Sequence, residues 1–370
     1  MKECDLILLS WNQTELLRSC IESILACTKT PSRLIIVDNA SGAETLRYLK
    51  SVKGNETVQV KILYNDTNDG FAKGMNRGMR ISDAPFVCLM NNDTVVTDGW
   101  LTEMIKVAES SEDIGVVNPD SNTTGTGPAG PDGLEEFLKI RGAHAGYGEM
   151  ATCIGFCMLI KRCVINKIGY LNEGIGRFNY EDTDYSLSAK KEGYRCVLAK
   201  GSYVYHYISS SLKMVKGIKA LSDKNRERFE TKWGRALRIF FVSSKDACDE
   251  NNGFKDDLRR AVMLIGMNNF VYFVYRDKVR RSRGDLFEML GMPEHGSLAA
   301  IPFAGPRRLF GLFCLFRVLK RLKKRYNIIL AKEPFKSMLE KFTFFHNAEV
   351  FDSEYNFKGD ELWKKRFQFQ

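Results

Sequence analysis

A run of apolar residues that stops at two amides and a carboxylate is the most constraining feature of this sequence. Phe86-Val87-Cys88-Leu89-Met90 leads directly into Asn91-Asn92-Asp93. Five consecutive apolar residues predict a strand buried on both faces, as in a parallel sheet. Open α/β sheets bind their ligands outside the carboxyl ends of the strands. The sequence therefore predicts oxygen ligands at a binding edge, while an isolated Asn-Asn-Asp also fits the alternative of a helix cap.

Strand-like runs and helical patterns alternate on both sides of this stretch. Such alternation is typical of a doubly wound α/β sheet with right-handed crossovers. The expected strands at 5–10, 34–37, 58–64 and 86–90 are separated by helices at 15–26, 44–50 and 70–78. Strand-like runs at 114–117, 153–161, 165–171, 195–199 and 203–207 continue the pattern, with helices at 101–110, 181–192 and 225–233.

The length and the charge distribution predict two domains. A chain of 370 residues exceeds the usual size of one domain. Residues 1–250 carry 32 basic and 32 acidic residues, whereas residues 251–370 carry 23 basic and 13 acidic residues. With the polar stretch 249–253 as a linker, we expect domains at 1–245 and 246–370. The second is expected to be a smaller α/β region with short strands at 297–303, 327–330 and 348–351.

Cysteine usage and hydropathy point to the cytoplasm. The ten cysteines lie scattered, and none forms a Cys-x-x-Cys pair, which is typical of reduced thiols. The sequence starts with a charged residue and a strand, not with a secretory signal. The apolar run Leu309–Leu319 contains Arg317 and is too short to span a bilayer. No nucleic-acid-binding motif accompanies the basic charge, so we expect no nucleic-acid partner.

Two segments near the expected strand ends have the composition of a nucleotide site. Asp93 is the best candidate for a metal ligand, because Mg²⁺ and Mn²⁺ take carboxylate oxygens. The segment Gly70–Gly78 opens a helix, and its glycines would let backbone amides approach a diphosphate, with Lys73 as a counter-charge. This segment matches neither the Rossmann fingerprint nor the P-loop pattern.

Two features of the second half allow both a structural and a functional interpretation. Glu181-Asp182-x-Asp184 places three carboxylates in the first turn of a helix, where they would complement the helix dipole. Alternatively, one of them would remove a proton from an attacking hydroxyl. His206 lies between tyrosines on an apolar strand, where a histidine is usually a hydrogen-bonded core residue. Beside a metal site it would be a ligand.

The order and spacing of several motifs carry a resemblance to a known family. The motifs are Ile35–Ser41, Asn68–Gly78, Leu89–Thr94 and Tyr180–Leu187, joined by Thr152–Lys161 and Lys232–Gly234. Together they resemble family 2 glycosyltransferases of the bacterial rhamnosyltransferase-like and polysaccharide-assembly group. The resemblance covers residues 4 to about 240.

This resemblance implies a GT-A fold with a doubly wound mixed sheet and an inverting hexosyltransferase. The donor would be a nucleoside-diphosphate sugar of the UDP or dTDP type, and the acceptor a hydroxyl of a glycan or a lipid-linked molecule in bacterial surface polysaccharide synthesis. Asp182 would be the catalytic base beside Glu181, and Asp93 and His206 would hold Mg²⁺ or Mn²⁺. The implied donor-binding residues are Asp38, Asn68, Gly70, Phe71, Lys73, Asn76, Asn91 and Asn92, and residues 152–156 would line the sugar pocket.

The chain departs from the family pattern at Asn91, which stands at the first position of the Asp-x-Asp motif. The amide oxygen of Asn91 still accepts hydrogen bonds, and Asp93 is the carboxylate that remains in the motif.

Two other functions fit parts of the sequence. A nucleotidyltransferase would need a basic, glycine-rich loop where this chain has Ser10–Gln13. A catalytically idle nucleotide-sugar or glycan-binding module would have no use for the acidic pair at 181–182.

The C-terminal region carries two further expectations. Tyr326–Pro334 faintly resembles the first half of a GT-B glycosyltransferase, which would make residues 246–370 a partial GT-B-like domain. The basic amphipathic segment Arg307–Arg325 fits a peripheral contact with the cytoplasmic face of the inner membrane. It also fits a core-facing helix with a solvated basic face.

Overall fold

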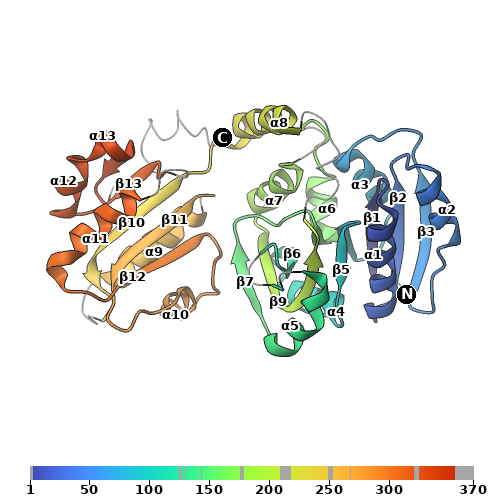
Figure 1. Ribbon diagram of the computed structural model, residues 1–370, viewed down its shortest axis with the longest axis horizontal. Coiled ribbons are helices and arrows are strands. Elements are labelled where there is room, and N and C mark those ends of the chain that lie inside the picture. Colours follow the sequence, from blue (N-terminus) through green and yellow to red (C-terminus); the bar gives the residue numbers. More distant parts are fainter. Residues whose placement is uncertain are drawn as a thin grey trace. The chain divides into compact units, whose positions relative to one another are not determined.

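The chain divides into two units, residues 1–231 and 232–370. The computed structural model (Figure 1) describes residues 3–124, 127–128, 130–142, 144–175, 179–208, 218–248, 253–266, 268–320 and 325–354. The division lies upstream of the boundary expected after residue 245. The reason is that β10 (Arg238–Asp246), counted with the first domain in the sequence, pairs with strands of the second sheet. Most of the expected linker 249–253 lies outside the described residues.

The first unit is built on a mixed sheet in the strand order β3-β2-β1-β4-β8-β6-β9-β5, with β7 paired to β9. Strands β1 to β4 are parallel, and β8 runs antiparallel to both β4 and β6. The strands are β1 (Cys4–Ser10), β2 (Ser32–Asp38), β3 (Val58–Tyr64), β4 (Phe86–Asn91), β5 (Thr94–Val96), β6 (Ile114–Asp120), β7 (Tyr147–Met150), β8 (Cys157–Lys161) and β9 (Arg195–His206). The predicted α/β class with a mixed sheet is confirmed.

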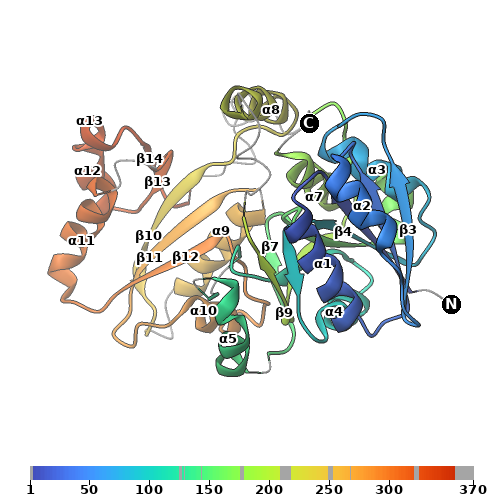
Figure 2. The ribbon, with the colours of Figure 1, turned by 45° about the vertical axis from the view of Figure 1, so that its right-hand side comes forward.

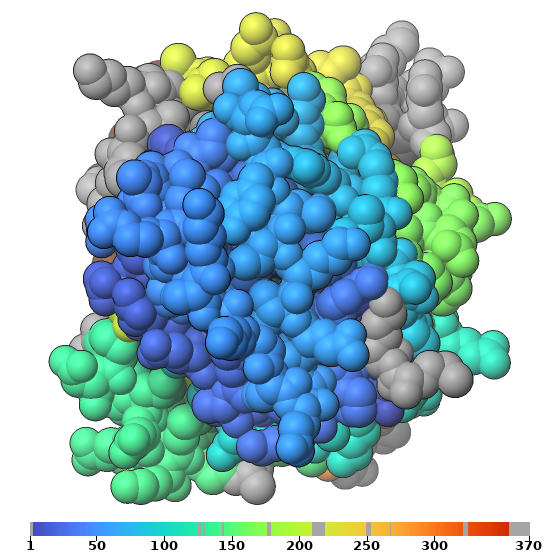
Figure 3. Space-filling view, turned by 90° about the vertical axis from the view of Figure 1, so that its right-hand side faces the viewer, coloured from blue at the N-terminus to red at the C-terminus, as the bar shows by residue number. Residues whose placement is uncertain are grey.

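Helices cover both faces of this sheet, and alternate residues of β1 point to one face or the other. Leu6 and Leu8 join a core with α1 (Thr14–Cys27), α2 (Ala43–Ser51) and α4 (Trp100–Glu109). Ile7 joins the opposite core. That core includes α3 (Phe71–Arg80), α6 (Arg162–Ile168) and α7 (Glu181–Lys191); η1 (Pro131–Gly133), α5 (Leu134–Arg141) and α8 (Ile218–Trp233) complete the unit. Figure 3 shows the face of the molecule that the N-terminal elements form, drawn in blue.

The strand expected at 165–171 is wrong, because these residues belong largely to α6 and the turn that follows it. Its buried residues, Val164 and Ile165, are adjacent, so the short apolar run carried no helical period. Gly169 ends the helix at φ 79°, a left-handed conformation that glycine adopts without strain.

Two glycines of the 70–78 segment let α3 approach the sheet closely. A Cβ at Gly74 would lie 2.3 Å from Leu9 Cδ1, and one at Gly78 would lie 2.5 Å from Ile7 Cγ2. Both glycines are therefore packing residues against β1. The third glycine, Gly70, precedes α3 at φ 83°.

The second unit contains a parallel sheet in the order β12-β11-β10-β13-β14, sandwiched between two helical layers (Figure 2). One core joins the sheet to α9 and α10, and the other joins it to α11 and α12. The predicted short strands correspond to β12 (Leu298–Phe303), β13 (Ile328–Leu330) and β14 (Glu349–Phe351). The other elements are β11 (Phe270–Arg276), α9 (Phe254–Gly266), α10 (Arg283–Glu288), α11 (Arg307–Leu319), α12 (Phe335–Glu340) and α13 (Thr343–His346). Among the described helices, none has the length and apolar character needed to cross a bilayer.

A buried charge anchors the amino ends of β1 and β4. Asp5 accepts hydrogen bonds from Arg33 Nε and Nη2 at 2.9 and 3.0 Å and from the backbone N–H groups of Asp83 and Ala84. Its side chain is fully buried. Removing Asp5 leaves two backbone amides without their acceptor and takes one of two carboxylate partners from the largely buried Arg33, which still contacts Asp83.

We predict that Asp5→Ala lowers the free energy of unfolding by about 3–5 kcal/mol. The matched control is Glu15→Ala, because Glu15 forms an exposed pair with Arg18 on α1. That substitution should cost less than about 1 kcal/mol. Urea denaturation of the two variants measures the difference, and equal losses would contradict a structural role for the Asp5 pair.

Candidate active site

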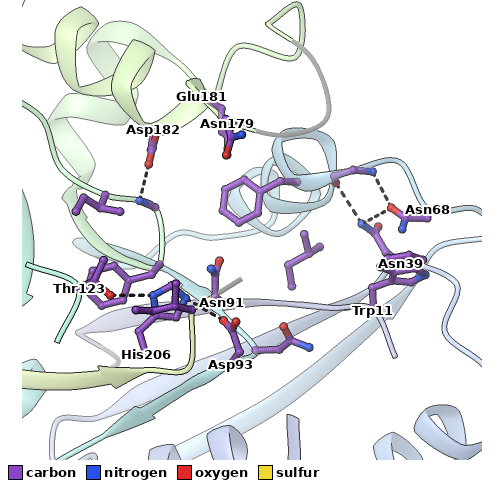
Figure 4. Close-up of a pocket in the computed structure, with 18 residues that line it drawn as sticks. Trp11, Asn39, Asn68, Asn91, Asp93, Thr123, Asn179, Glu181, Asp182 and His206 are labelled. Carbon is purple, nitrogen blue, oxygen red and sulfur yellow. Dashed lines mark hydrogen bonds and ion pairs between the residues drawn. The ribbon is translucent and has the colours of Figure 1, made fainter. Parts of the chain in front are cut away.

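A cavity of about 340 Å³ opens at the carboxyl ends of β1 and β4 in the first unit (Figure 4). Loops after β1, β2 and β4 form one side, the start of α7 forms the opposite side, and the end of β9 closes it. The lining residues are Leu9, Trp11, Asn39, Asn68, Gly70, Phe71, Asn91, Asn92, Asp93, Thr123, Ile154, Gly155, Phe156, Asn179, Glu181, Asp182, His206 and Ile208. Segments that lie more than a hundred residues apart in the sequence thus share one cavity.

Most of the residues singled out from the sequence meet in this cavity, but Asp38, Lys73 and Asn76 do not line it, and of the expected segment 152–156 only Ile154, Gly155 and Phe156 do. Asp38 is buried at the end of β2, and its Oδ2 accepts a hydrogen bond from Ser41 N at 3.0 Å. Lys73 is exposed on α3. Asn76 is occupied elsewhere, because its amide binds the backbone of Leu171 through both its oxygen and its nitrogen.

The expected cation ligands lie side by side on one wall. His206 Nε2 lies 3.2 Å from Asp93 Oδ1, and both side chains are buried. The other ring nitrogen, Nδ1, is 3.0 Å from Thr123 Oγ1. The Phe156 ring stacks on the imidazole with centroids 5.1 Å apart and planes at 14°. These contacts hold the imidazole in one orientation beside Asp93.

The Asp93–His206 pair fits a divalent cation in part. His206 Nε2 and Asp93 Oδ1 lie 3.2 Å apart, close enough for both atoms to reach one ion. Carboxylate and imidazole are both suitable ligands of Mn²⁺. In the described part of the chain, no cluster of three or more His, Cys, Asp or Glu side chains is placed to hold a metal ion. The remaining ligands would therefore come from a substrate phosphate or from water.

The acidic pair faces this wall from the start of α7. Asp182 Oδ2 accepts a hydrogen bond from Gly155 N at 2.8 Å, and Oδ1 accepts one from Thr183 N at 2.6 Å. A Cβ on Gly155 would lie 3.3 Å from Asp182 Cβ, so glycine permits this close approach. Burial raises the pKa of Asp182, while these backbone donors lower it and hold the carboxylate in place.

Glu181 has a more strongly perturbed environment than its neighbour. Its Oε2 is buried, and it has no hydrogen-bond partner among the described residues. Burial, and secondarily the charge of Asp182, raises the pKa of Glu181 to about 8.

The two residues before α7, Asn179 and Tyr180, have φ angles of 63° and 75°. A left-handed conformation at a tyrosine is strained, and here it precedes the acidic pair directly.

A network of three asparagines shapes the other end of the cavity. Asn39 Nδ2 donates to Asn68 Oδ1 at 3.3 Å and to Gly70 O at 3.2 Å. Asn65 Nδ2 in turn donates to Asn39 Oδ1 at 2.6 Å. This network ties the loop after β2 to the start of α3. Trp11, from the loop after β1, lines the same end.

Sequence reasoning missed Trp11, Asn39, Thr123, Asn179 and Ile208. Asn39 stood directly after Asp38 at a strand end, and Trp11 stood in the corresponding place after β1, so strand-end position alone would have found both. Thr123 lies in a long polar loop, a class of segment that often carries function. Ile208 carried no signal of that kind.

Residues 5–169 match the model of the family described as Glycosyl transferase family 2. The resemblance to family 2 glycosyltransferases is thus confirmed over these residues. The uncharacterized protein y4gI of Sinorhizobium fredii is 28% identical over 225 residues, 56% of this chain and 24% of that protein. The poly-beta-1,6-N-acetyl-D-glucosamine synthase of Staphylococcus epidermidis is 22% identical over 169 residues, 44% of this chain and 40% of the synthase. This chain therefore spans well under half of either relative.

Among solved structures, the mannosyltransferase PcManGT from Pyrobaculum calidifontis in complex with GDP-Man and Mn²⁺ is similar, with a TM-score of 0.45. It is 14% identical to this chain, and the similarity covers 60% of each chain.

We predict that the stability of the protein depends on pH through Glu181. A carboxyl group whose pKa is higher in the folded state holds a proton that the unfolded chain releases, so stability falls as pH rises from about 4.5 to about 8. Glu181→Gln lacks this group and should lose less stability over the same range, by about 1.4 kcal/mol for each pKa unit of the shift. Urea denaturation at pH 5 and pH 8 measures this, and parallel losses in both proteins would contradict the burial of Glu181.

Proposed function

We propose that the chain transfers a sugar from a nucleoside-diphosphate donor to a hydroxyl group with inversion at the anomeric carbon. The observation that carries this proposal is the arrangement of one cavity with the Asp93–His206 pair on one wall and the Glu181–Asp182 pair opposite. Such a separation lets a leaving diphosphate and an attacking hydroxyl occupy opposite sides of a sugar. The family match over residues 5–169 supports the same reaction class.

The donor end of the cavity lies between Trp11 and Asn68. An indole ring and the three-asparagine network offer a stacking surface and hydrogen bonds for a nucleobase and ribose. Asp38, Asn76 and Lys73 lie outside the lining, so we assign the direct donor contacts to Asn68, Gly70, Phe71, Asn91 and Asn92. A donor of the UDP or dTDP type remains our proposal.

Asp93 and His206 would hold Mg²⁺ or Mn²⁺, which neutralises the charge that develops on the leaving diphosphate. The chain's own residues perform the other steps. Asp182 accepts the proton of the attacking hydroxyl, and the donors of Gly155 and Thr183 keep its carboxylate aligned. Glu181, protonated at neutral pH, donates a hydrogen bond to the acceptor or the sugar.

The acceptor in this proposal is a glycan or a lipid-linked molecule of bacterial surface polysaccharide synthesis, and the reaction takes place in the cytoplasm or at the cytoplasmic face of the membrane. One relative, the Staphylococcus epidermidis synthase, is named for a polysaccharide product. Two alternative functions differ from this proposal in what they release. An idle glycan-binding module would bind its ligand without turnover, and a nucleotidyltransferase would release pyrophosphate instead of a nucleoside diphosphate.

We predict that Asp182→Asn lowers the rate of nucleoside-diphosphate release from the best donor of a nucleotide-sugar panel by at least about 100-fold, because an amide cannot accept the proton. Donor affinity should change little. Asp184→Asn is the matched control, since it removes a carboxylate from the same helical turn without altering the cavity lining. If both variants slow release equally, the acidic cluster serves the helix and not the chemistry.

We predict that substitutions around the Asp93–His206 pair weaken Mn²⁺-dependent binding of UDP to different degrees. Asp93→Ala should abolish Mn²⁺-dependent binding of UDP, and Thr123→Val should weaken it by about 10- to 100-fold, because His206 loses the partner that orients its ring. Thr123→Ser keeps the hydroxyl and should bind like the wild type. Calorimetric titrations of UDP with and without Mn²⁺ measure the series. A Thr123→Val protein with wild-type affinity would remove Thr123 from this role.

A further inference from the structure

Helix α11 of the second unit has two apolar faces. Phe310, Cys314 and Val318 are buried against the sheet. A second stripe consists of Leu309, Leu312 and Phe316, which are 44, 61 and 59% exposed. Spacings of three and four residues place these three side chains on one face of the helix, roughly opposite the buried stripe. The helix therefore presents to solvent an apolar face that the fold of this unit does not use.

A second pair of exposed apolar side chains comes from α13, which packs against α11. Phe344 and Phe345 are 91 and 61% exposed. The buried imidazole of His346 fixes their backbone, because its Nδ1 accepts from Ala348 N at 3.1 Å and its Nε2 lies 3.0 Å from Leu339 O. The two phenylalanines are thus held at the surface by an ordered turn. Single exposed apolar residues are common, but a cluster from two packed helices marks an interaction surface.

Positive charge flanks the exposed stripe. Arg308, Arg317 and Lys320 are exposed, and the Lys320 ammonium lies 5.6 Å from the centroid of the Phe316 ring. Residues 307–320 contain no acidic side chain. The nearby acid of α12, Glu340, is paired with Lys336. The surplus of basic over acidic residues in the whole chain also falls in residues 251–370.

We propose that the exposed stripe of α11 and the aromatic pair of α13 dock on an anionic lipid bilayer. Leucine and phenylalanine on one face of a helix with arginine and lysine at its margins form the surface that lies in the headgroup layer. Each basic residue near an anionic surface strengthens binding about fivefold. The core of a protein–protein interface is instead depleted of lysine. The sequence allowed two interpretations of the 307–325 segment, a membrane contact and a core-facing helix. The buried stripe of α11 packs in the core, and the exposed stripe favours the membrane contact. Residues 321–324 lie outside the described part of the chain.

Docking of this kind would bring the transfer reaction to the surface where lipid-linked acceptors reside. The docking itself does not depend on the proposed reaction, because vesicle binding is measured without donor or acceptor. A failure of catalysis and a failure of docking are therefore separate results.

The test is co-sedimentation of the full chain with phosphatidylcholine vesicles that contain either no phosphatidylglycerol or about 30% of it. We expect binding to the anionic vesicles that is at least about tenfold tighter and that weakens with added salt. Leu312→Glu/Phe316→Glu and Phe344→Glu/Phe345→Glu should each weaken binding at least about tenfold. Ile140→Glu is the control, because Ile140 is a comparably exposed apolar residue of the first unit (78%) and its substitution should not affect binding. Because all of these sites are exposed, the variants should keep the wild-type circular dichroism spectrum.

Three results would overturn the proposal. The first is a wild type that fails to bind anionic vesicles. The second is that the α11 double variant and the α13 double variant both bind as tightly as Ile140→Glu. A third result would be a wild-type dimer in sedimentation velocity that Leu312→Glu/Phe316→Glu dissociates, which would assign the surface to a second copy of the chain.

Discussion

The pairing of β1 between β2 and β4 determines where the cavity lies. The parallel register sets Ser10 opposite Asp38 and Leu9 opposite both Val37 and Asn91. Three strands therefore end at the same level. The segments that follow them begin at Trp11, Asn39 and Asn92. The register alone brings these segments together, whatever contacts their side chains make. The close approach of α3 at Gly74 and Gly78 then brings Gly70 and Phe71 to this edge. The cavity is a consequence of backbone register.

Hydrophobic pattern and strand-end logic predicted this arrangement well. The apolar run before Asn91 became a fully buried strand, and its polar end lies on the cavity wall. The sequence could not show which of several similar residues contact a ligand and which serve packing or hold the backbone. The glycines of the 70–78 segment suggested a phosphate cradle, yet two of them serve helix packing. Asn76 was an equally plausible ligand contact, but its amide holds Leu171. Both outcomes depend on which face of a helix meets the sheet, which a local pattern does not specify.

His206 illustrates why the sequence could not decide between two interpretations of one residue. The sequence offered a core histidine or a metal ligand as alternatives. The antiparallel pairing of β5 with β9 sets Thr94 opposite His206, so the imidazole is buried in the wall and also adjacent to Asp93. The stacking of Phe156 and the contact with Thr123 come from two other segments. Long-range pairing of this kind leaves no trace in the residues around position 206.

The burial of Glu181 has a consequence for the charge of the cavity as a whole. Asp93, Glu181 and Asp182 all line the cavity, and three negative carboxylates would repel the diphosphate of the proposed donor. With its pKa raised to about 8, Glu181 is mostly neutral at pH 7. A neutral Glu181 lowers the negative charge that the cavity lining presents to such an anion. In the proposed reaction the site binds an anion and also removes a proton, and a protonated Glu181 lets Asp182 serve as the base without adding a further negative charge beside the donor.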